Sequence, residues 1–472
     1  MKKIARKLLC AAILVSPMSG FSDTLSEIFD LAVNNDPQLR AAHAAYMAGK
    51  ESKNIGRAGL LPRVIGSAEY SETDSDDYSR SVFVLDGQTV DSGSSGRGDA
   101  EQTIFGVSLT QPLFNLPAWY DFKQGRTISD QARIQYAAEQ QELILRVTEA
   151  YFNVLRASEN LTSAIAEQEA IGRQLEQTRQ RYDVGLLPIT DVHEAQAAFD
   201  DARVNTLELR GSLNVAFEAL EVLTGRPHQQ LAGLTANFPV NDPEPGAREE
   251  WVNFSLQNNL DLKVTQLARD AASHNADARK AEHLPTLTGS YSYTDTDFDK
   301  DFRGRSLTGD RINTPSANDN EVSVVALRLD VPIFTGGLVS AQRRQAYQQY
   351  VQAEETANAV QRNVTQQART SHLNVVTNAA RVTARQQAII SADSALEATR
   401  AGYEVGTRNI VDVLFAERTL YQAKRNYANA RYDYIASTLE LKRVAGQLSP
   451  SDVYQLNAWL DPALIIEPTT VR

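Results

Sequence analysis

The 472-residue sequence predicts a mainly α-helical protein with a small β part, built from long coiled coils and two β-hairpins. Three observations predict this class. Helical patterns without proline run for about 65 residues, short segments alternate apolar and polar side chains, and the second half of the chain repeats the first. The length therefore indicates one duplicated, elongated protomer rather than several globular domains.

The composition excludes several classes of protein. With 42% hydrophobic and 22% charged residues, the chain has enough apolar side chains for a packed core. Its net charge of −12 argues against nucleic acid as a partner, because binding phosphates requires a basic surface. A single cysteine excludes a disulfide framework and a cysteine-rich metal site. No apolar run is long enough for a transmembrane helix.

The N-terminus predicts a secretory signal peptide over residues 1–22. Four basic residues precede the apolar run at 8–15, and the sequence Gly20-Phe21-Ser22 before Asp23 is the expected cleavage site. Cys10 lies inside this segment and lacks the small preceding residue of a lipoprotein signal. Removal of the segment changes the formal charge from −12 to −16 and leaves an exported, thiol-free chain.

The second half repeats the first. Residues 182–185 (YDVG) and Asp191 recur 221 positions later as residues 403–406 (YEVG) and Asp412, and the proline-rich stretch 239–245 joins the copies. The period is too long for a solenoid unit. The expected organisation begins with a signal peptide (1–22) and a first repeat (23–238), which contains a β-hairpin at 62–114 and a helical hairpin at 118–225. A linker or equatorial segment (239–250) leads to a second repeat (251–446), which contains a β-hairpin at 285–334 and a helical hairpin at 338–446. A C-terminal equatorial tail (447–472) follows.

Each copy begins with helix and continues into a β-hairpin. Residues 23–60 are Ala-rich with few breakers, which favours helix, and residues 64–70 then alternate as a strand does. A polar loop is expected over 72–101, followed by a second strand at 105–110. The same strand patterns recur at 287–293 and 325–331. Prolines stand where the patterns change, at Pro62, Pro112, Pro285 and Pro332.

A long helical pattern follows each hairpin. Residues 118–182 contain no proline and would extend about 100 Å as a helix. Apolar residues recur every seven positions, which indicates left-handed coiled-coil packing. The positions are Val375, Val382, Ile389, Leu396 and Tyr403 in the second copy, and Val154, Leu161, Leu175 and Tyr182 in the first, where Gln168 interrupts the series.

The strands have about the 9–11 residues that cross a membrane as tilted β-strands. An ordinary soluble hairpin is the more common use of this pattern and remains an alternative. However, the chain is exported, and four lone strands among long helices make no independent sheet. Four strands are also too few for a closed barrel, so a membrane barrel would have to be shared between chains.

The chain resembles the TolC family of outer-membrane export channels in its duplication, its proline-flanked strands and the strings RYDVGLLPITDV (181–192) and GYEVGTRNIVDVL (402–414). The resemblance covers residues 23 to about 460 and is to the type I secretion and multidrug efflux branch. It implies a homotrimer in which four strands per chain form a 12-stranded transmembrane β-barrel in outer-membrane lipid. It also implies that the helices form an α-helical barrel that extends into the periplasm.

The resemblance also implies a gate at the periplasmic end. Asp191 would bond to Arg408 and Tyr403 as a latch, whereas Asp412 would project into the lumen as a ring of three carboxylates, which favours cations. An ordinary i,i+4 ion pair between Arg408 and Asp412 is the simpler interpretation. Phe415 stands where the best-known pattern of the family is acidic, which indicates a weaker cation site and a more hydrophobic constriction.

The helical tips carry a second implied role. Gly185 and Gly406 lie between helical patterns, where a helix C-cap needs φ > 0. In the family these tips dock a periplasmic adaptor (membrane fusion) protein, which connects the channel to an inner-membrane pump of the RND or ABC type. Gly185, Leu186, Gly406 and Thr407 are therefore the expected docking residues.

No catalytic constellation, cofactor motif or metal site is found. Asp295, Asp297 and Asp299 resemble the start of an EF-hand, but Lys300 and Ser306 occupy the positions that need Gly and Glu. The sequence contains no HExxH, GxSxG, Walker or GxGxxG string. The expected function is an exit duct for efflux or type I protein secretion and not an enzyme. The alternative is an exported structural or adhesive coiled-coil protein without a channel.

Overall fold

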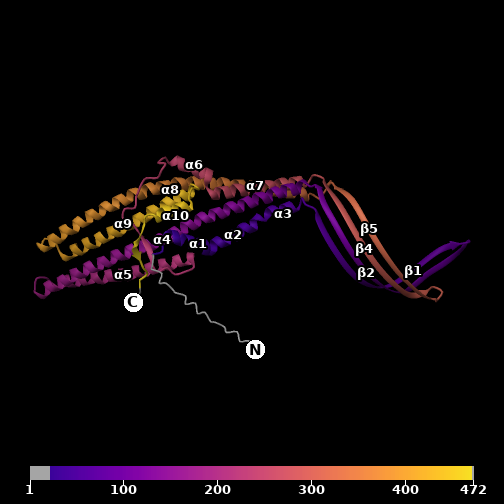
Figure 1. Ribbon diagram of the computed structural model, residues 1–472, viewed down its shortest axis with the longest axis horizontal. Helices are drawn as coiled ribbons and strands as arrows, with labels where there is room; N and C mark the ends of the chain where they lie inside the picture. The colour runs from indigo at the N-terminus through magenta and orange to yellow at the C-terminus, as the bar shows by residue number, and fades with distance from the viewer. Residues whose placement is uncertain (1–21, 470–472) are drawn as a thin grey trace, which may run out of the picture. The chain divides into compact units, whose positions relative to one another are not determined.

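The computed structural model describes residues 22–469 (Figure 1). The chain divides into two compact units, of which one contains residues 47–133 and 264–357 and carries four long strands. The other unit contains the segments before, between and after these ranges and is almost wholly helical. The predicted signal peptide, residues 1–22, lies outside the described residues except for Ser22.

The chain passes twice through short helices, a β-hairpin and a pair of long helices. The first pass contains α1 (Leu25–Asn35), α2 (Pro37–Lys50), α3 (Ser52–Ala58), β1 (Arg63–Leu85), β2 (Gln88–Phe114), α4 (Leu116–Asp183), α5 (Ile189–Thr224) and β3 (Leu231–Leu234). The second contains α6 (Arg248–Asn258), α7 (Leu260–Ala281), β4 (Thr286–Ser306), β5 (Arg311–Asp330), α8 (Leu338–Glu404), α9 (Ile410–Val444), α10 (Pro450–Asn457) and β6 (Leu460–Ile466).

The four long strands form one antiparallel sheet in the order β1-β2-β4-β5. The register between β1 and β2 runs without a break to the pair Leu85 and Gln88, where Asp86 and Gly87 form the turn with φ of 48° and 78°. The polar loop expected over 72–101 is therefore wrong, because almost all of this segment is paired strand. Backbone hydrogen bonds across the hairpin override the weak strand preference of Ser, Asp and Gly.

The helical unit is held by the predicted coiled-coil positions. Helices α4 and α8 contain 68 and 67 residues. The buried heptad residues are Val154, Leu161, Leu175, Val375, Val382 and Leu396. All of these except Leu396 belong to two clusters that include residues of α4, α5, α8 and α9, as the sevenfold spacing predicts. No helix within residues 22–469 is both long and apolar enough to cross a membrane.

The helical segment expected over 23–60 is broken into three helices. The first break is at Asp36, and Pro37 begins α2, where its missing N–H leaves no unmet hydrogen bond. The Asp36 carboxylate accepts a hydrogen bond from Gln38 N at 2.8 Å and pairs with Arg146 at 2.7 Å. This carboxylate therefore holds the start of α2 against α4.

Candidate functional site

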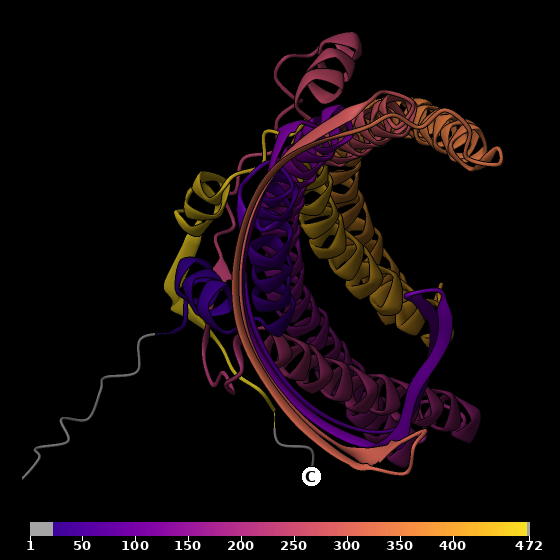
Figure 2. The same cartoon turned by 90° about the vertical axis from the view of Figure 1, so that its right-hand side faces the viewer.

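The four-stranded sheet is curved (Figure 2), and one of its faces carries exposed apolar side chains. Phe105, Val107 and Leu109 of β2 lie on this face, and Leu109 is opposite Tyr291 of β4, which is opposite Val325 of β5. All five side chains are exposed, Val325 to 82%. Soluble monomers rarely expose a contiguous apolar band of this kind, so the band indicates contact with lipid or with other chains.

The opposite face of the sheet is small and polar. In β2 it carries Gln102, Ala100, Gly98, Gly96 and Ser94 in alternate positions, and none of these is exposed, whereas Ser95, Arg97 and Glu101 between them are. The outer edges of β1 and β5 have no partner strand within the described chain. Backbone edges cannot face lipid without hydrogen bonds, so strands of other chains must pair with them in a membrane.

Two sharp turns end the long helices in the same way. Gly185 and Gly406 have φ of 79° and 78°, in the left-handed region. Leu186 N donates to the carbonyl of Arg181 at 2.9 Å, and Thr407 N donates to that of Gly402 at 2.8 Å. Both turns are thus Schellman-type caps, as the sequence predicts for these glycines.

The helices that follow the turns begin differently in the two copies. Asp412 is the third residue of α9 and forms a capping box with Asn409, whose N–H lies 3.4 Å from the Asp412 carboxylate. The corresponding residue before α5 is Pro188, which has no N–H to donate. Within the described chain, the Asp191 carboxylate accepts a single hydrogen bond, from Thr190 Oγ1 at 3.4 Å. Asp191 is therefore free to accept further hydrogen bonds.

The structure does not join the three expected latch residues within one chain. Tyr403 Oη is buried and has no hydrogen-bond partner among residues 22–469, while the Arg181 guanidinium lies 5.3 Å from the centre of its ring. Arg408 Nη1 is 3.8 Å from Asp412 Oδ2, as the simpler i,i+4 interpretation expects. No described contact connects Asp191 to either residue, so the latch stays a prediction.

The side chains around the turns are exposed and partly apolar. Leu186 and Phe415 are 72% and 71% exposed. Val184 and Val405, one residue before each glycine, are also exposed, whereas Thr407 Oγ1 donates to the carbonyl of Gly402 at 3.0 Å. These tips therefore present apolar side chains on rigid turns.

One polar pair near the tips was not expected from the sequence. Arg400 Nη2 of α8 lies 2.6 Å from Glu417 Oε1 of α9, and Glu417 is only 1% exposed. The positions 221 residues earlier hold the neutral equivalent, because Arg179 Nη2 donates to Gln196 Oε1 at 2.5 Å. A comparison of polar residues between the two copies would have revealed the pair.

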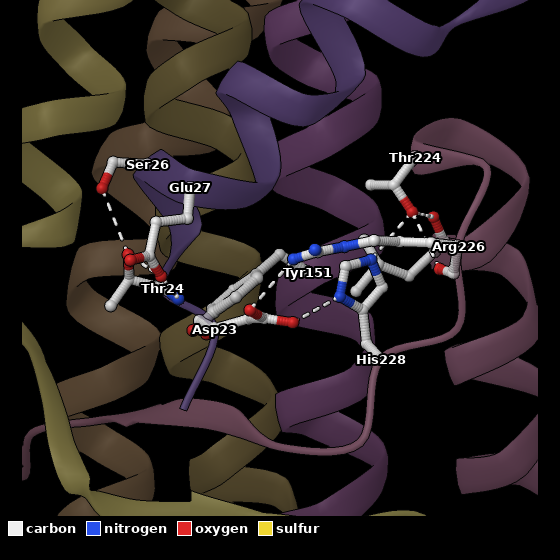
Figure 3. Close-up of polar contacts among 9 residues, drawn as sticks. Asp23, Thr24, Ser26, Glu27, Tyr151, Thr224, Arg226 and His228 are labelled. Carbon is white, nitrogen blue, oxygen red and sulfur yellow. Dashed lines mark hydrogen bonds and ion pairs between the residues drawn. The ribbon is translucent and has the colours of Figure 1, made fainter. Parts of the chain in front are cut away.

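A polar cluster surrounds the first residue after the predicted cleavage site (Figure 3). The Asp23 carboxylate contacts His228 Nδ1 at 2.7 Å and Arg226 Nη2 at 3.2 Å, and His228 Nε2 lies 2.8 Å from Thr224 Oγ1. Asp23 also bridges to Leu231 of β3, which pairs with β6. The cluster therefore ties Asp23, just before α1, to the segment after α5.

Thr224, His228 and Asp23 link a hydroxyl, an imidazole and a carboxylate as a catalytic triad does, but a substrate cannot reach them. Thr224 is 1% exposed and His228 is 4% exposed, so no substrate reaches the hydroxyl. Beside it, Tyr151 Oη donates to the Ala232 carbonyl at 2.6 Å, and burial raises the pKa of this phenol. The described residues contain no group of His, Cys, Asp and Glu that could hold a metal ion.

Comparison with known proteins identifies relatives over almost the full chain. The family described as outer membrane efflux protein matches residues 28–226 and 251–447. Outer membrane protein TolC of Vibrio cholerae serotype O1 is 37% identical over 465 residues, covering 98% of this chain and 100% of that protein. Proteases secretion protein PrtF of Dickeya chrysanthemi is 29% identical over 472 residues, covering 99% and 98%.

Solved structures share the fold. The crystal structure of the outer membrane protein VceC from Vibrio cholerae aligns with a TM-score of 0.70 at 18% identity, covering 89% of this chain and 96% of that chain. At this identity the likeness establishes the architecture of long helices and a strand sheet alone.

Proposed function

Since this chain belongs to the outer membrane efflux protein family, we propose that three copies of it form one exit duct across the outer membrane and the periplasm. The chain is an outer-membrane channel for efflux or secretion. The relatives are channel proteins, and the channel provides a passage rather than bond chemistry. The alternative of a structural coiled-coil protein without a channel is not favoured by the family match.

The sheet supports the trimer. Its apolar face is exposed and its two edge strands, β1 and β5, have no partner in the described chain. If β1 of one copy pairs with β5 of the next, three copies close a 12-stranded barrel with no free edge. The apolar face then contacts lipid and the small polar face lines the passage. This exposed band on an open-edged sheet is the observation that carries the proposal.

The gate is proposed at the helical tips, with a latch between chains. The Asp191 carboxylate has spare acceptor capacity because Pro188 cannot donate to it, and Tyr403 Oη has an unused donor. Arg408 is held by Asp412 at only 3.8 Å and can pair elsewhere. In a trimer, Asp191 would bond to Arg408 and Tyr403 of a neighbouring chain and keep the tips closed.

Asp412 and Phe415 are proposed as the luminal constriction. Threefold symmetry would place three copies of each around the axis. The Asp412 carboxylates favour cations, although each is also engaged by the Asn409 N–H. Phe415 is 71% exposed in one chain, so three rings would supply an apolar narrowing next to the charged ring.

The tips are also proposed as the docking site of a periplasmic adaptor protein, which would connect the channel to an inner-membrane pump of the RND or ABC type. Gly185 and Gly406 fix the turns, and Leu186 and Thr407 stand directly after them. Exposed apolar side chains on rigid turns suit a protein partner, because little conformational entropy is lost on binding.

The double substitution Asp191→Ala with Arg408→Ala tests the gate. Purified trimers, verified by SDS–PAGE of unheated samples, are measured in planar bilayers, and the variant should conduct more than the unmodified channel. Glu176→Ala, at an exposed site on α4, is the matched surface control. Unchanged conductance in the double variant would overturn the latch, whereas the absence of trimers would overturn the duct itself.

A further inference from the structure

The end of the β1–β2 hairpin carries a second exposed apolar surface, which we call the apolar tip: residues 82–85 with Val90. Val82, Phe83, Val84 and Leu85 are between 47% and 70% exposed. None of them belongs to the membrane-facing band described above or to the proposed gate. A cluster of this size on an extended hairpin requires a covering surface.

The apolar tip projects beyond the rest of the sheet. Pairing between β2 and β4 stops at Ser94 and Ser306, whereas pairing between β1 and β2 continues to Leu85 and Gln88. Both edges of this terminal ribbon are thus unpaired in the described chain. Free strand edges are usually blunted by charge or proline, and residues 82–85 contain neither.

The ribbon bends where it leaves β4. Figure 2 shows its end leaving the arc of the sheet and turning toward the concave side. The bend depends on glycine, since a Cβ on Gly96 would lie 2.3 Å from the carbonyl oxygen of Arg303 and one on Gly93 would lie 2.4 Å from that of Ser79. The direction of the tip therefore depends on the glycine positions within the strands.

The unbroken register assigns each tip residue to a face. Phe83, Leu85 and Val90 continue the small polar face of the sheet, because Phe83 is opposite Val90 and the alternation has no bulge. On that face the residues of β1 between 71 and 81 are Ser, Thr and Asp, so the face becomes apolar only at the tip. The other face holds Val82 and Val84, but also the ion pair between Arg80 and Asp91 at 2.5 Å.

Lipid of the same membrane is a poor match for the apolar tip. Residues 71–81 separate it from the apolar band and consist of Ser, Thr, Glu, Asp and Arg apart from Tyr78. A strand crosses the hydrocarbon in about 9–11 residues, so this polar stretch already lies outside it. The inward bend also turns the tip away from the convex, lipid-facing side.

We propose that the apolar tips of three copies of this chain meet over the outer mouth of the channel and close it from the outside. The proposal rests on the trimeric duct proposed above. Each Phe83, Leu85 and Val90 faces the passage side, and threefold symmetry brings the three sets together at the axis. The resulting plug is a barrier at the outer mouth of the channel, and cargo must displace it on exit.

Cysteine cross-linking tests this arrangement, because the only cysteine of the chain lies in the predicted signal peptide. A disulfide forms when two Cα atoms are about 4.4–6.8 Å apart. Oxidised trimers of Leu85→Cys should therefore give covalent dimers on denaturing, non-reducing gels. The matched control is Val84→Cys, one residue away on the opposite face, which should give several-fold less dimer.

The outcomes separate the plug from the duct. Trimers that form normally but give no Leu85→Cys dimer, or equal dimer from both positions, overturn the plug and leave the duct intact. A missing trimer on unheated gels overturns the duct. A fluorophore on Leu85→Cys should also resist quenching by nitroxide-labelled lipid chains, and strong quenching would assign the tip to lipid instead.

Discussion

Replacing Arg400 by methionine is expected to loosen the α8–α9 hairpin next to the proposed gate. Arg400 Nη2 lies 2.6 Å from the carboxylate of Glu417, whose other oxygen is buried without a partner in the described chain. Removing one partner of a buried ion pair costs about 3–5 kcal/mol, because the other charge is left unpaired. The Arg400 side chain is 49% exposed, and solvent therefore weakens the pair, so we expect about 3 kcal/mol.

The first copy provides the matched control. Arg179 occupies the equivalent position in α4, but its partner Gln196 is neutral and only partly buried. Arg179→Met leaves no buried charge and should cost about 1 kcal/mol or less. The double variant Arg400→Met with Glu417→Gln removes the charge as well and should recover most of the loss.

Hydrogen exchange followed by mass spectrometry measures these effects in detergent-solubilised trimers. A loss of about 3 kcal/mol corresponds to roughly 100-fold more frequent local opening. Peptides from 396–421 should therefore exchange much faster in Arg400→Met, while peptides from 175–200 should change little in Arg179→Met. Equal effects in the two hairpins, or no recovery in the double variant, would refute the buried-charge argument.

Three further predictions concern Tyr151, the turn at Gly406 and the proposed constriction. Tyr151→Phe removes the hydrogen bond to Ala232 and should cost about 1–1.5 kcal/mol in thermal unfolding. Burial raises the pKa of Tyr151 and so favours the neutral phenol in the folded state. Above about pH 10 the unfolded chain loses this proton, so the unmodified protein should lose stability with rising pH more steeply than Tyr151→Phe does. Gly406→Ala forces a side chain into the left-handed region at about 1–2 kcal/mol and should lower drug resistance in cells without lowering the amount of trimer, so loss of the trimer would contradict a docking role. Asp412→Asn should reduce cation selectivity and Phe415→Asp should increase it, as measured by reversal potentials across a salt gradient, and unchanged potentials would remove both residues from the constriction.

Helical regularities were predictable because they depend on local spacing. Six positions of the sevenfold series, among them Val154 and Val375, are buried as expected, whereas Tyr182 is exposed, and both tip glycines adopt positive φ. These features follow from the helical period and from the conformational freedom of glycine. They required no knowledge of distant parts of the chain.

The length of the strands was not predictable in the same way. Residues 72–101 have the composition of a loop, and their strand conformation depends on hydrogen bonds between β1 and β2, with β4, about 200 residues further along the chain, pairing only from Ser94 onward. The pair of Arg400 and Glu417 was missed for a related reason, because a Glu on a helix is ordinarily solvated. Both failures concern contacts that only the folded chain brings together.

The expected latch differs from these features, because its contacts depend on neighbouring copies of the chain. One chain leaves Tyr403 Oη buried without a partner and Asp191 with one long hydrogen bond. Unused hydrogen-bonding groups at the same end of the helical unit are costly unless another molecule satisfies them. The single chain therefore supports the latch indirectly, through what it leaves unpaired.

The two copies of the repeat have diverged at positions that determine how easily each helical hairpin moves. The second copy has Gly336 and Gly337, both with positive φ, between its hairpin strand and its long helix, whereas the first copy has Leu116 and Pro117 at the equivalent positions, already as the first two residues of α4. Proline restricts the backbone and glycine frees it. Near the tip, the second copy also substitutes a buried carboxylate, Glu417, for a neutral amide. A trimer would thus contain two kinds of hairpin, one stiffly connected and one flexibly connected and held by charge. The pair of Arg400 with Glu417 joins the two helices of the second hairpin, so the contrast in hydrogen exchange between Arg400→Met and Arg179→Met reports how far charge holds that hairpin together.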